Sequence, residues 1–340
     1  MARILQPNNF DHLRLFLALS VACVHAATLS GEPQLAWMNH CFNSKLAVDG
    51  FFIISGCMVT ASYERSRSWR DYLGKRARRI YPGYVAVIIA SLLLGACITS
   101  SAQYWQEGTT WRYLAANLVF LNFLAPLLPG VFDASPVNMH AVNGALYTIK
   151  IEVLFYLLLP FLVLLHRKTG VMRLLAGLYI LSCLYYYAAA PLSTVLARQL
   201  PGQLRYFAVG MALYYFGDAW RKYLHRLLIP AAIIVGFYSF DVDALPLETI
   251  YPAAVGVLVA WVAYGLPRLG NLMRVGDISY GVYIVHFPLI QLAVQMGWLN
   301  THPLAGAALV GAVVVALAIA LWHLVEKPAL RADSHYRQKI

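Results

Sequence analysis

Charged residues are scarce in this sequence: Asp, Glu, Lys and Arg make up 12% of its 340 residues, whereas hydrophobic residues make up 60%. A typical soluble protein carries about 25% charged residues, so the composition excludes a soluble globular class. The five cysteines form no CxxC pair, and neither a metal site nor a disulfide framework is expected. The G-x-S-x-G, P-loop, G-x-G-x-x-G and H-E-x-x-H motifs are also absent, which leaves no signature of a common soluble enzyme.

Long apolar runs fill the chain instead. Runs of about 20 residues bounded by charges, proline or glycine are long enough to cross a bilayer as helices. We predict an all-α polytopic transmembrane helical bundle with about ten spans, both termini in the cytoplasm and a single domain over residues 1–340. The spans are expected near residues 10–29, 42–63, 80–101, 144–165, 171–190, 203–217, 227–240, 249–266, 278–297 and 303–325.

The net charge of +11 is explained by orientation in a membrane and not by nucleic-acid binding. With a cytoplasmic N-terminus, twenty of the 26 Lys and Arg residues fall in cytoplasmic segments and three in external ones. We therefore expect a multi-pass protein of the cell (inner) membrane that contacts lipid. The first run has features of a cleavable signal peptide, but we expect it to be retained as a span.

Two ionisable residues interrupt the first span. Such groups cost about 2.5–3.5 kcal/mol each at membrane depth, which makes them functional candidates. Arg14 and His25 are eleven residues apart, about three helical turns, so they share one face of the helix. Two plainer readings stay open, since His25 could be a structural hydrogen-bonding group and Arg14 could extend its side chain to the interface.

Other spans carry ionisable residues as well. Asp49 and Glu152 are expected at a depth similar to that of His25, and His286 near mid-membrane. Asp49 could equally serve only as the partner of Lys45, one helical turn earlier. The cytoplasmic segment Arg65–Arg79 carries seven cations. These could anchor the protein on anionic lipid or form a cradle for a phosphorylated soluble ligand.

Six short motifs, taken in order, resemble the acyltransferase family 3 of integral-membrane proteins over essentially the whole chain. They are Arg14-x10-His25, "VDGFFIISG" ending at Gly56, "RARRIYP" from Arg76 to Pro82, "ALYTIKIEVLFYLLLP" around Glu152, "DISYGVYIVHFPL" around His286, and "EKP" from Glu326 to Pro328. Tyr147 stands where that family usually has Trp, which leaves any aromatic contact there open.

The resemblance implies an O-acyltransferase that moves an acyl group, most often acetyl, from cytoplasmic acetyl-CoA to a hydroxyl of a cell-surface or lipid-linked carbohydrate. We expect acetyl-CoA as a co-substrate, no permanently bound cofactor and no nucleic-acid partner. A separate extracytoplasmic partner could complete the transfer. The expected roles are catalysis by His25, Arg14 and Glu152; donor binding by Arg14, Arg76, Arg79 and Tyr81; and acceptor-side contacts by Asp49, Glu152 and His286.

Within this scheme His25 is expected to be the general base, because imidazole can be unprotonated near neutral pH and still take a proton. Direct transfer is preferred, since no Ser or Cys motif stands out, although an acyl-histidine stays open. Two other classes compete with the enzyme. A transporter or glycolipid flippase would also line a path with intramembrane charges, but no self-similar halves are found. In a membrane-embedded interaction or sensor protein, Arg14 and His25 would serve helix packing alone.

Overall fold

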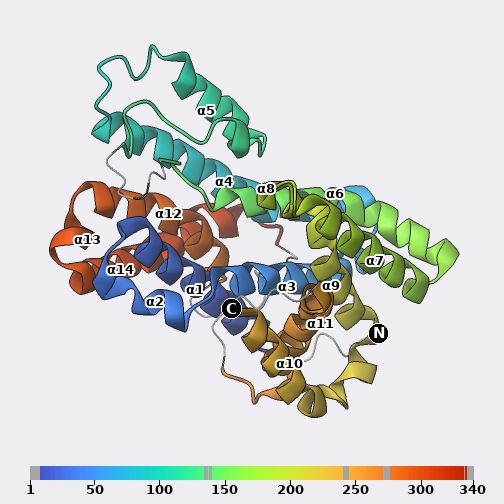
Figure 1. Ribbon diagram of the computed structural model, residues 1–340. Helices are drawn as coiled ribbons and strands as arrows, with labels where there is room; N and C mark the ends of the chain where they lie inside the picture. Colours follow the sequence, from blue (N-terminus) through green and yellow to red (C-terminus); the bar gives the residue numbers. More distant parts are fainter. Residues whose placement is uncertain are drawn as a thin grey trace. The chain divides into compact units, whose positions relative to one another are not determined.

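The structure is a computed structural model that describes residues 8–133, 137, 140–239, 245–270, 276–332 and 334. Both chain ends, and four of the cations counted for orientation (Arg3, Arg274, Arg337 and Lys339), lie outside the described residues. The regular secondary structure of the described residues is entirely helical, with no strand (Figure 1). The prediction of an all-α polytopic protein is confirmed.

The chain divides into two compact units, each built from segments far apart in the sequence. The first comprises residues 1–17, 45–73 and 151–270, and the second residues 18–44, 74–150 and 271–340. The chain passes from one unit to the other five times: within three helices, after the first residue of a fourth, and after Gly270. These helices are α1 (Phe10–Ser30), α4 (Trp69–Ile98), α6 (Leu146–Thr169) and, at its start, α3 (Ser44–Glu64).

The first unit is a bundle of apolar helices. α7 packs against α9, and α11 packs against both α9 and α10. The first unit holds α3, most of α6 and the starts of α1 and α4. Its other helices are α7 (Val171–Ala189), α8 (Thr194–Ala197), α9 (Leu200–Arg221), α10 (Leu224–Ser239) and α11 (Leu245–Ala260), which continues as the π-helix η4 (Trp261–Gly265).

Two glycines let α3 and α9 cross in contact. A Cβ atom on Gly56 would lie 2.5 Å from the carbonyl oxygen of Phe207, and one on Gly210 would lie 2.1 Å from that of Ile53. Neither distance is sterically possible, so only glycine allows the two backbones to approach this closely. Gly56 ends the "VDGFFIISG" motif, and this crossing is the physical reason for its last residue.

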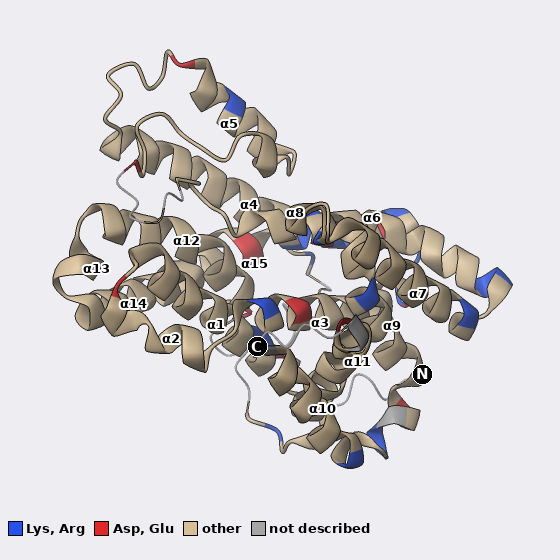
Figure 2. Ribbon diagram, viewed as in Figure 1, with Lys and Arg blue, Asp and Glu red and all other residues tan. Residues whose placement is uncertain are grey.

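The second unit is built around α12 (Ser279–Gln295), in which nearly every side chain is buried. α12 packs along α14 (Pro303–Leu321), and neither helix contains a charged residue (Figures 1 and 2). The remaining elements are η2 (Pro33–Leu35), α2 (Trp37–Cys41), α5 (Gly108–Leu118), η3 (Asn122–Leu124), α13 (Trp298–Thr301), the π-helix η6 (Trp322–Glu326) and α15 (Lys327–Ala329).

Each of the ten expected spans coincides with a helix, but not all of these helices have the length and composition of a span. Among the described residues, seven helical segments are long and apolar enough to cross a membrane, and Leu224–Tyr238 is a shorter apolar helix. α12 has 17 residues, and α9 carries Arg205, Asp218 and Arg221. The count of ten therefore stays a prediction, as do the cytoplasmic termini.

Candidate active site

The residues singled out by the sequence divide between the two units. Arg14, Asp49 and Glu152 belong to the first unit; His25, Arg76, Arg79, Tyr81 and His286 belong to the second. Helix α1 changes unit between Leu17 and Ala18, so Arg14 and His25 lie on the same helix but in different units.

In the second unit, a proline opens a backbone position beside His286. Pro288 lies inside α12 and has no N–H, so the carbonyl of Ile284, one turn earlier, loses its helical partner. The side-chain amide of Asn143 donates to this carbonyl at 2.8 Å. Asn143 is itself buried, so the bond satisfies two polar groups that have no access to water.

The chain around Asn143 follows α12 for several further contacts. The hydroxyl groups of Thr148 and Tyr283 are 2.7 Å apart, and Gln291 donates to the carbonyl of Ala141 at 3.1 Å. These bonds fix the segment 141–148 along α12 on both sides of His286. The helix is thereby held at a defined rotation, which is what a precisely oriented imidazole requires.

His25 and His286 form a direct hydrogen bond. Nδ1 of His25 lies 2.8 Å from Nε2 of His286, and the two ring planes are inclined by only 13°. The ring centroids are 5.1 Å apart, much farther than the nitrogens. The rings therefore meet edge to edge in nearly a common plane, which is the geometry of an N–H pointing at a ring lone pair.

The surroundings of the two histidines differ. His286 has an exposed fraction of 0%, and its Nδ1 lies 3.2 Å from the carbonyl oxygen of Val282. His25 is only half-buried, and the ring of Phe287 meets it edge-on with 5.2 Å between centroids. Within the described part of the chain, Nε2 of His25 has no hydrogen-bond partner. The pair thus has one enclosed member and one that can be reached.

Arg79 lies at the N-terminal end of α12, between two carboxylates. One of its guanidinium nitrogens is 2.7 Å from Asp277, and another bonds Glu326. All three side chains are buried; Arg79 is 5% exposed. The guanidinium is also 5.3 Å from the ring centroid of Tyr280 and 5.4 Å from that of Trp322, within the range of a cation–π contact.

Arg79 is therefore placed differently from an exposed phosphate ligand, and donor binding by this residue stays a prediction. Its charge is already balanced by carboxylates from the "DISYG" and "EKP" motifs, for which the sequence suggested no role. Gly276, with φ of +112°, brings the backbone against the Trp322 ring where a Cβ would lie 2.2 Å from it. The three motifs thus form one packed ionic cluster that joins α4, α12 and η6.

The neighbouring residues of the basic segment are more accessible. Arg76 is half-buried, and Tyr81 is 43% exposed with its ring near that of Phe120. Of the predicted donor-binding residues in this unit, these two can present polar groups outward, whereas Arg79 is enclosed.

In the first unit, Glu152 is bonded to two hydroxyl groups. Ser55, from the "VDGFFIISG" motif on α3, donates to its carboxylate at 2.7 Å. Tyr156, one turn along α6, donates to the same oxygen. Glu152 therefore links α3 and α6, and its carboxylate is held in a fixed direction.

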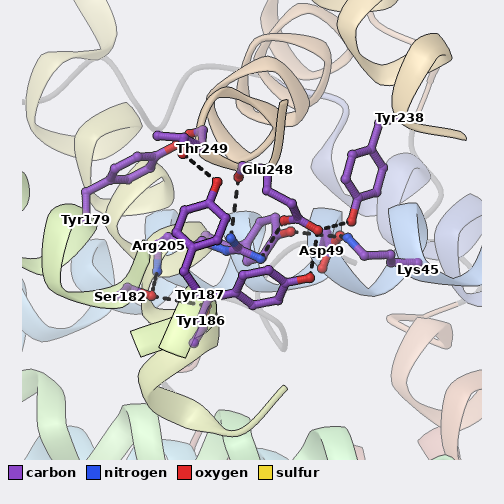
Figure 3. A network of polar contacts seen from close by, with 12 residues as sticks. Lys45, Asp49, Tyr179, Ser182, Tyr186, Tyr187, Arg205, Tyr238, Glu248 and Thr249 are labelled. Carbon is purple, nitrogen blue, oxygen red and sulfur yellow. Dashed lines mark hydrogen bonds and ion pairs between the residues drawn. The ribbon is translucent and has the colours of Figure 1, made fainter. Parts of the chain in front are cut away.

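Asp49 pairs with Lys45, as one reading of the sequence allowed, with 2.9 Å between the charged atoms. The Lys45 ammonium lies 4.5 Å from the ring centroids of both Tyr238 and Tyr251 (Figure 3 shows the pair and Tyr238). Aromatic rings around an ammonium stabilise it by cation–π attraction, more strongly when water is excluded. The acceptor contact predicted for Asp49 is compatible with this pairing, because Lys45 stays partly exposed.

A second ion pair adjoins the first. The guanidinium of Arg205, 1% exposed, bonds Glu248 at 3.0 Å and stacks on the Tyr186 ring, 3.9 Å from its centroid. Glu248 also accepts hydrogen bonds from Tyr186 and Tyr238 (Figure 3). Tyr238 thus contacts both ion pairs, one with its hydroxyl and the other with its ring. Arg205 and the tyrosines were not predicted from the sequence; the signal for them was a set of charges and tyrosines near the predicted external ends of several spans.

Each cluster of polar residues is built from helix ends that the sequence predicts on the same side of the membrane. The Lys45–Glu248 network joins the predicted external ends of α3, α7, α9, α10 and α11. Glu64, His166 and Tyr215, which are in contact, come from predicted cytoplasmic ends of the same unit. In the second unit, the Arg79 cluster joins three predicted cytoplasmic ends. The packing is thus consistent with the predicted orientation of the helices that contribute to these clusters.

We expect Lys45→Met to lower the free energy of unfolding by about 1–3 kcal/mol, because it leaves the carboxylate of Asp49 buried without its cation. Denaturant unfolding in detergent micelles measures the effect. Lys168→Met, an exposed cation of α6, is the matched control and should change stability by less than about 0.5 kcal/mol. Unchanged stability with lost transfer would instead assign Lys45 and Asp49 to the acceptor.

The described residues contain no group of three or more His, Cys, Asp or Glu side chains placed to hold a metal ion. Among the described residues, the titratable groups that meet include a histidine pair within an apolar helical unit, ion pairs at helix ends, and Glu152 with Tyr156. Fold and site together define a polytopic all-α membrane protein in which the half-buried imidazole of His25 is hydrogen-bonded to the buried imidazole of His286.

Comparison with known proteins gives the family. Residues 8–323 match the family model described as an acyltransferase domain, and the match runs through both units, so the chain belongs to this family. The class predicted from the sequence, a multi-pass membrane O-acyltransferase, is confirmed. The family match favours the enzyme over the transporter and the sensor.

Two of the three relatives described here are named as O-acetyltransferases, and one is named as a nodulation protein. The chain is 31% identical to Nodulation protein 10 of Rhizobium leguminosarum bv. viciae, over 95% of this chain and 93% of that protein. It is 27% identical to an O-acetyl transferase of Shigella phage Sf6, over 97% and 98%. It is 22% identical to the putative peptidoglycan O-acetyltransferase YrhL of Bacillus subtilis (strain 168), over 94% and 54%. No solved structure gives a significant match.

Proposed function

We propose that this protein transfers an acetyl group from cytoplasmic acetyl-CoA to a hydroxyl group of a cell-surface or lipid-linked carbohydrate in the cell (inner) membrane. The single observation that carries the chemistry is the half-buried His25 ring, whose Nε2 has no partner within the described residues. Support for acetyl as the transferred group comes from the names of the phage and Bacillus relatives, and support for a surface polymer as the acceptor comes from the word peptidoglycan in the putative name of the Bacillus relative.

The proposed reaction is a direct transfer. His25 takes the proton of the acceptor hydroxyl as its oxygen attacks the thioester carbonyl, forming the new C–O bond. The C–S bond then breaks, and the leaving thiolate of CoA receives the proton from the His25 imidazolium. Direct attack needs one enzyme group for both proton steps, and an acyl-histidine would need a second base for the acceptor.

Donor binding is assigned to the cations near the cytoplasmic side. In the second unit Tyr81 is exposed and Arg76 is half-buried, and Arg14 keeps its predicted donor and catalytic roles in the first. Arginine suits the phosphates of CoA because its guanidinium donates two parallel hydrogen bonds. To Arg79 we assign a supporting part, because its guanidinium already pairs with Asp277 and Glu326.

We expect Arg76→Ala to weaken CoA binding by about 10- to 100-fold, because a charge-assisted hydrogen bond contributes about 1.5–3 kcal/mol. Equilibrium binding of CoA to purified protein in detergent measures the change. Arg78→Ala removes an exposed neighbouring cation and is the control for general electrostatic attraction. Equal losses in both variants would mean that the segment attracts CoA only by its general positive charge, and unchanged affinity in Arg76→Ala would make the segment a membrane anchor rather than a phosphate site.

The acceptor is assigned to the external side. Asp49 lies in the network of ion pairs and tyrosines at predicted external helix ends, and Glu152 holds an oriented carboxylate. Carboxylates accept hydrogen bonds from sugar hydroxyls, and aromatic rings pack on sugar faces. A separate extracytoplasmic protein that receives the acyl group stays a possible partner.

The function is tested with purified protein, radiolabelled acetyl-CoA and membranes that contain the native surface carbohydrate. We expect loss of the thioester together with transfer of label to the carbohydrate or lipid-linked fraction. Thioester loss with label only in free acetate would contradict the proposed acceptor. An intact thioester under conditions where CoA binds would contradict acyl transfer from CoA.

A further inference from the structure

The hydrogen bonds of His286 determine which of its nitrogens carries a proton. Nδ1 of His286 lies 3.2 Å from the carbonyl oxygen of Val282, one turn earlier on α12. A carbonyl oxygen can only accept, so Nδ1 must be the protonated nitrogen. In a neutral imidazole the other nitrogen, Nε2, then has a lone pair and no hydrogen.

His286 is neutral for reasons of burial. Its exposed fraction is 0%, and its described contacts are a backbone carbonyl, His25 and the rings of Tyr283 and Phe287, with no carboxylate among them. A charge enclosed in this way, without a counter-charge, would cost several kcal/mol or more. The ring therefore stays uncharged, and its Nε2 can only accept.

The proton between the two rings must come from His25. Because Nε2 of His286 accepts and lies 2.8 Å from Nδ1 of His25, Nδ1 of His25 carries the hydrogen. The lone pair of His25 is then on Nε2, the atom without a partner in the described residues. The chain of bonds from Val282 through His286 to His25 thus selects one tautomer of the reachable histidine.

We propose that His286 is a positioning residue that holds the hydrogen of His25 on Nδ1 and leaves Nε2 as its basic atom. The structural assignment concerns the two rings alone; its catalytic consequence rests on the proposed function. Since both nitrogens of His286 are engaged, the geometry supports this role rather than the acceptor contact predicted from the sequence. Pro288 and Asn143 fix α12 around His286, and Phe287 packs on the His25 ring, so the pair is held on several sides.

Two amide substitutions of similar polarity separate positioning from simple structural support. The amide of glutamine reaches the place of Nε2, so His286→Gln can still accept from Nδ1 of His25. The shorter amide of asparagine reaches only the place of Nδ1, so His286→Asn keeps the bond to Val282 and loses the one to His25. Thermal unfolding in detergent checks that both variants are folded.

The first readout is ¹⁵N NMR of histidine-labelled protein, with His25 signals identified by their loss in His25→Gln. We expect a protonated Nδ1 and an unprotonated Nε2 on His25 in the wild type and in His286→Gln. In His286→Asn we expect a shift toward the Nε2–H tautomer, which neutral imidazole prefers in water. A wild-type His25 protonated on Nε2, or a tautomer unchanged in His286→Asn, would overturn the proposal.

The second readout is thioester loss from acetyl-CoA. Because a base in the wrong tautomer cannot take the proton, His286→Asn should lower kcat by about 10²-fold with unchanged KM for acetyl-CoA, and His286→Gln should stay within about threefold. Equal losses in the two variants would overturn the positioning role. If the NMR result is as expected but neither the wild type nor either variant consumes acetyl-CoA, the tautomer assignment stands and the proposed function fails.

Discussion

His25→Ala is expected to lower kcat for acyl transfer by about 10²–10⁴-fold, the usual contribution of a positioned general base. The variant removes the ring that takes the proton from the acceptor hydroxyl and leaves the donor-binding residues in place. CoA affinity should therefore stay within about threefold of the wild type. Steady-state rates of thioester loss and equilibrium CoA binding, measured on the same preparation, separate the two effects.

His40→Ala is the matched control, because His40 is an exposed histidine of α2 in the same unit and lies outside the site. It should retain the wild-type rate. Near-normal transfer by His25→Ala would remove the histidine from the mechanism and leave Arg14 and Glu152 as the candidates. Loss of transfer together with loss of CoA binding would make His25 a donor ligand instead of the base.

Arg79→Ala is expected to lower the free energy of unfolding by about 3–5 kcal/mol. The substitution leaves the carboxylates of Asp277 and Glu326 buried without their cation, and removal of one partner from a buried ion pair costs this much. Denaturant unfolding in mixed micelles measures the effect. Asp277→Asn in the Arg79→Ala background should recover part of the loss, because it removes one of the two unpaired charges.

Arg78→Ala, one residue earlier and exposed, should change stability by less than about 0.5 kcal/mol. The pair of variants also decides between two roles for Arg79. The sequence predicts a phosphate ligand, for which Arg79→Ala would weaken CoA binding and leave unfolding unchanged. The packing predicts the opposite pattern, with lost stability and, in protein that stays folded, CoA affinity close to that of the wild type.

The sequence could not show which groups Arg79 meets. Its motif marks it as important, but a motif does not distinguish an arginine that binds phosphate from one that ties helices together. Asp277 is 198 residues away along the chain and Glu326 is 247 residues away. Both carboxylates stand in quoted motifs without an assigned role, because a role depends on which cation lies opposite in the folded chain.

The same limit applies to the acidic residues of the first unit. The sequence placed Asp49 one turn from Lys45, and the pair is confirmed, because residues four apart on a helix are neighbours whatever the tertiary structure. The tyrosines around Lys45 and the Arg205–Glu248 pair come from other helices. Only packing of those helices shows that Asp49 belongs to a larger network.

By itself the sequence determined the all-helical class, the apolar helices, the family and the identity of His25 as the leading candidate. These properties are encoded in short windows, where hydrophobicity, helical period and motif spacing act within one or two turns. Tertiary structure alone decided that His25 meets His286, 261 residues away, and therefore which ring nitrogen can act as a base. A tautomer is set by a hydrogen-bond partner, and no local pattern specifies a partner that arrives from a distant helix.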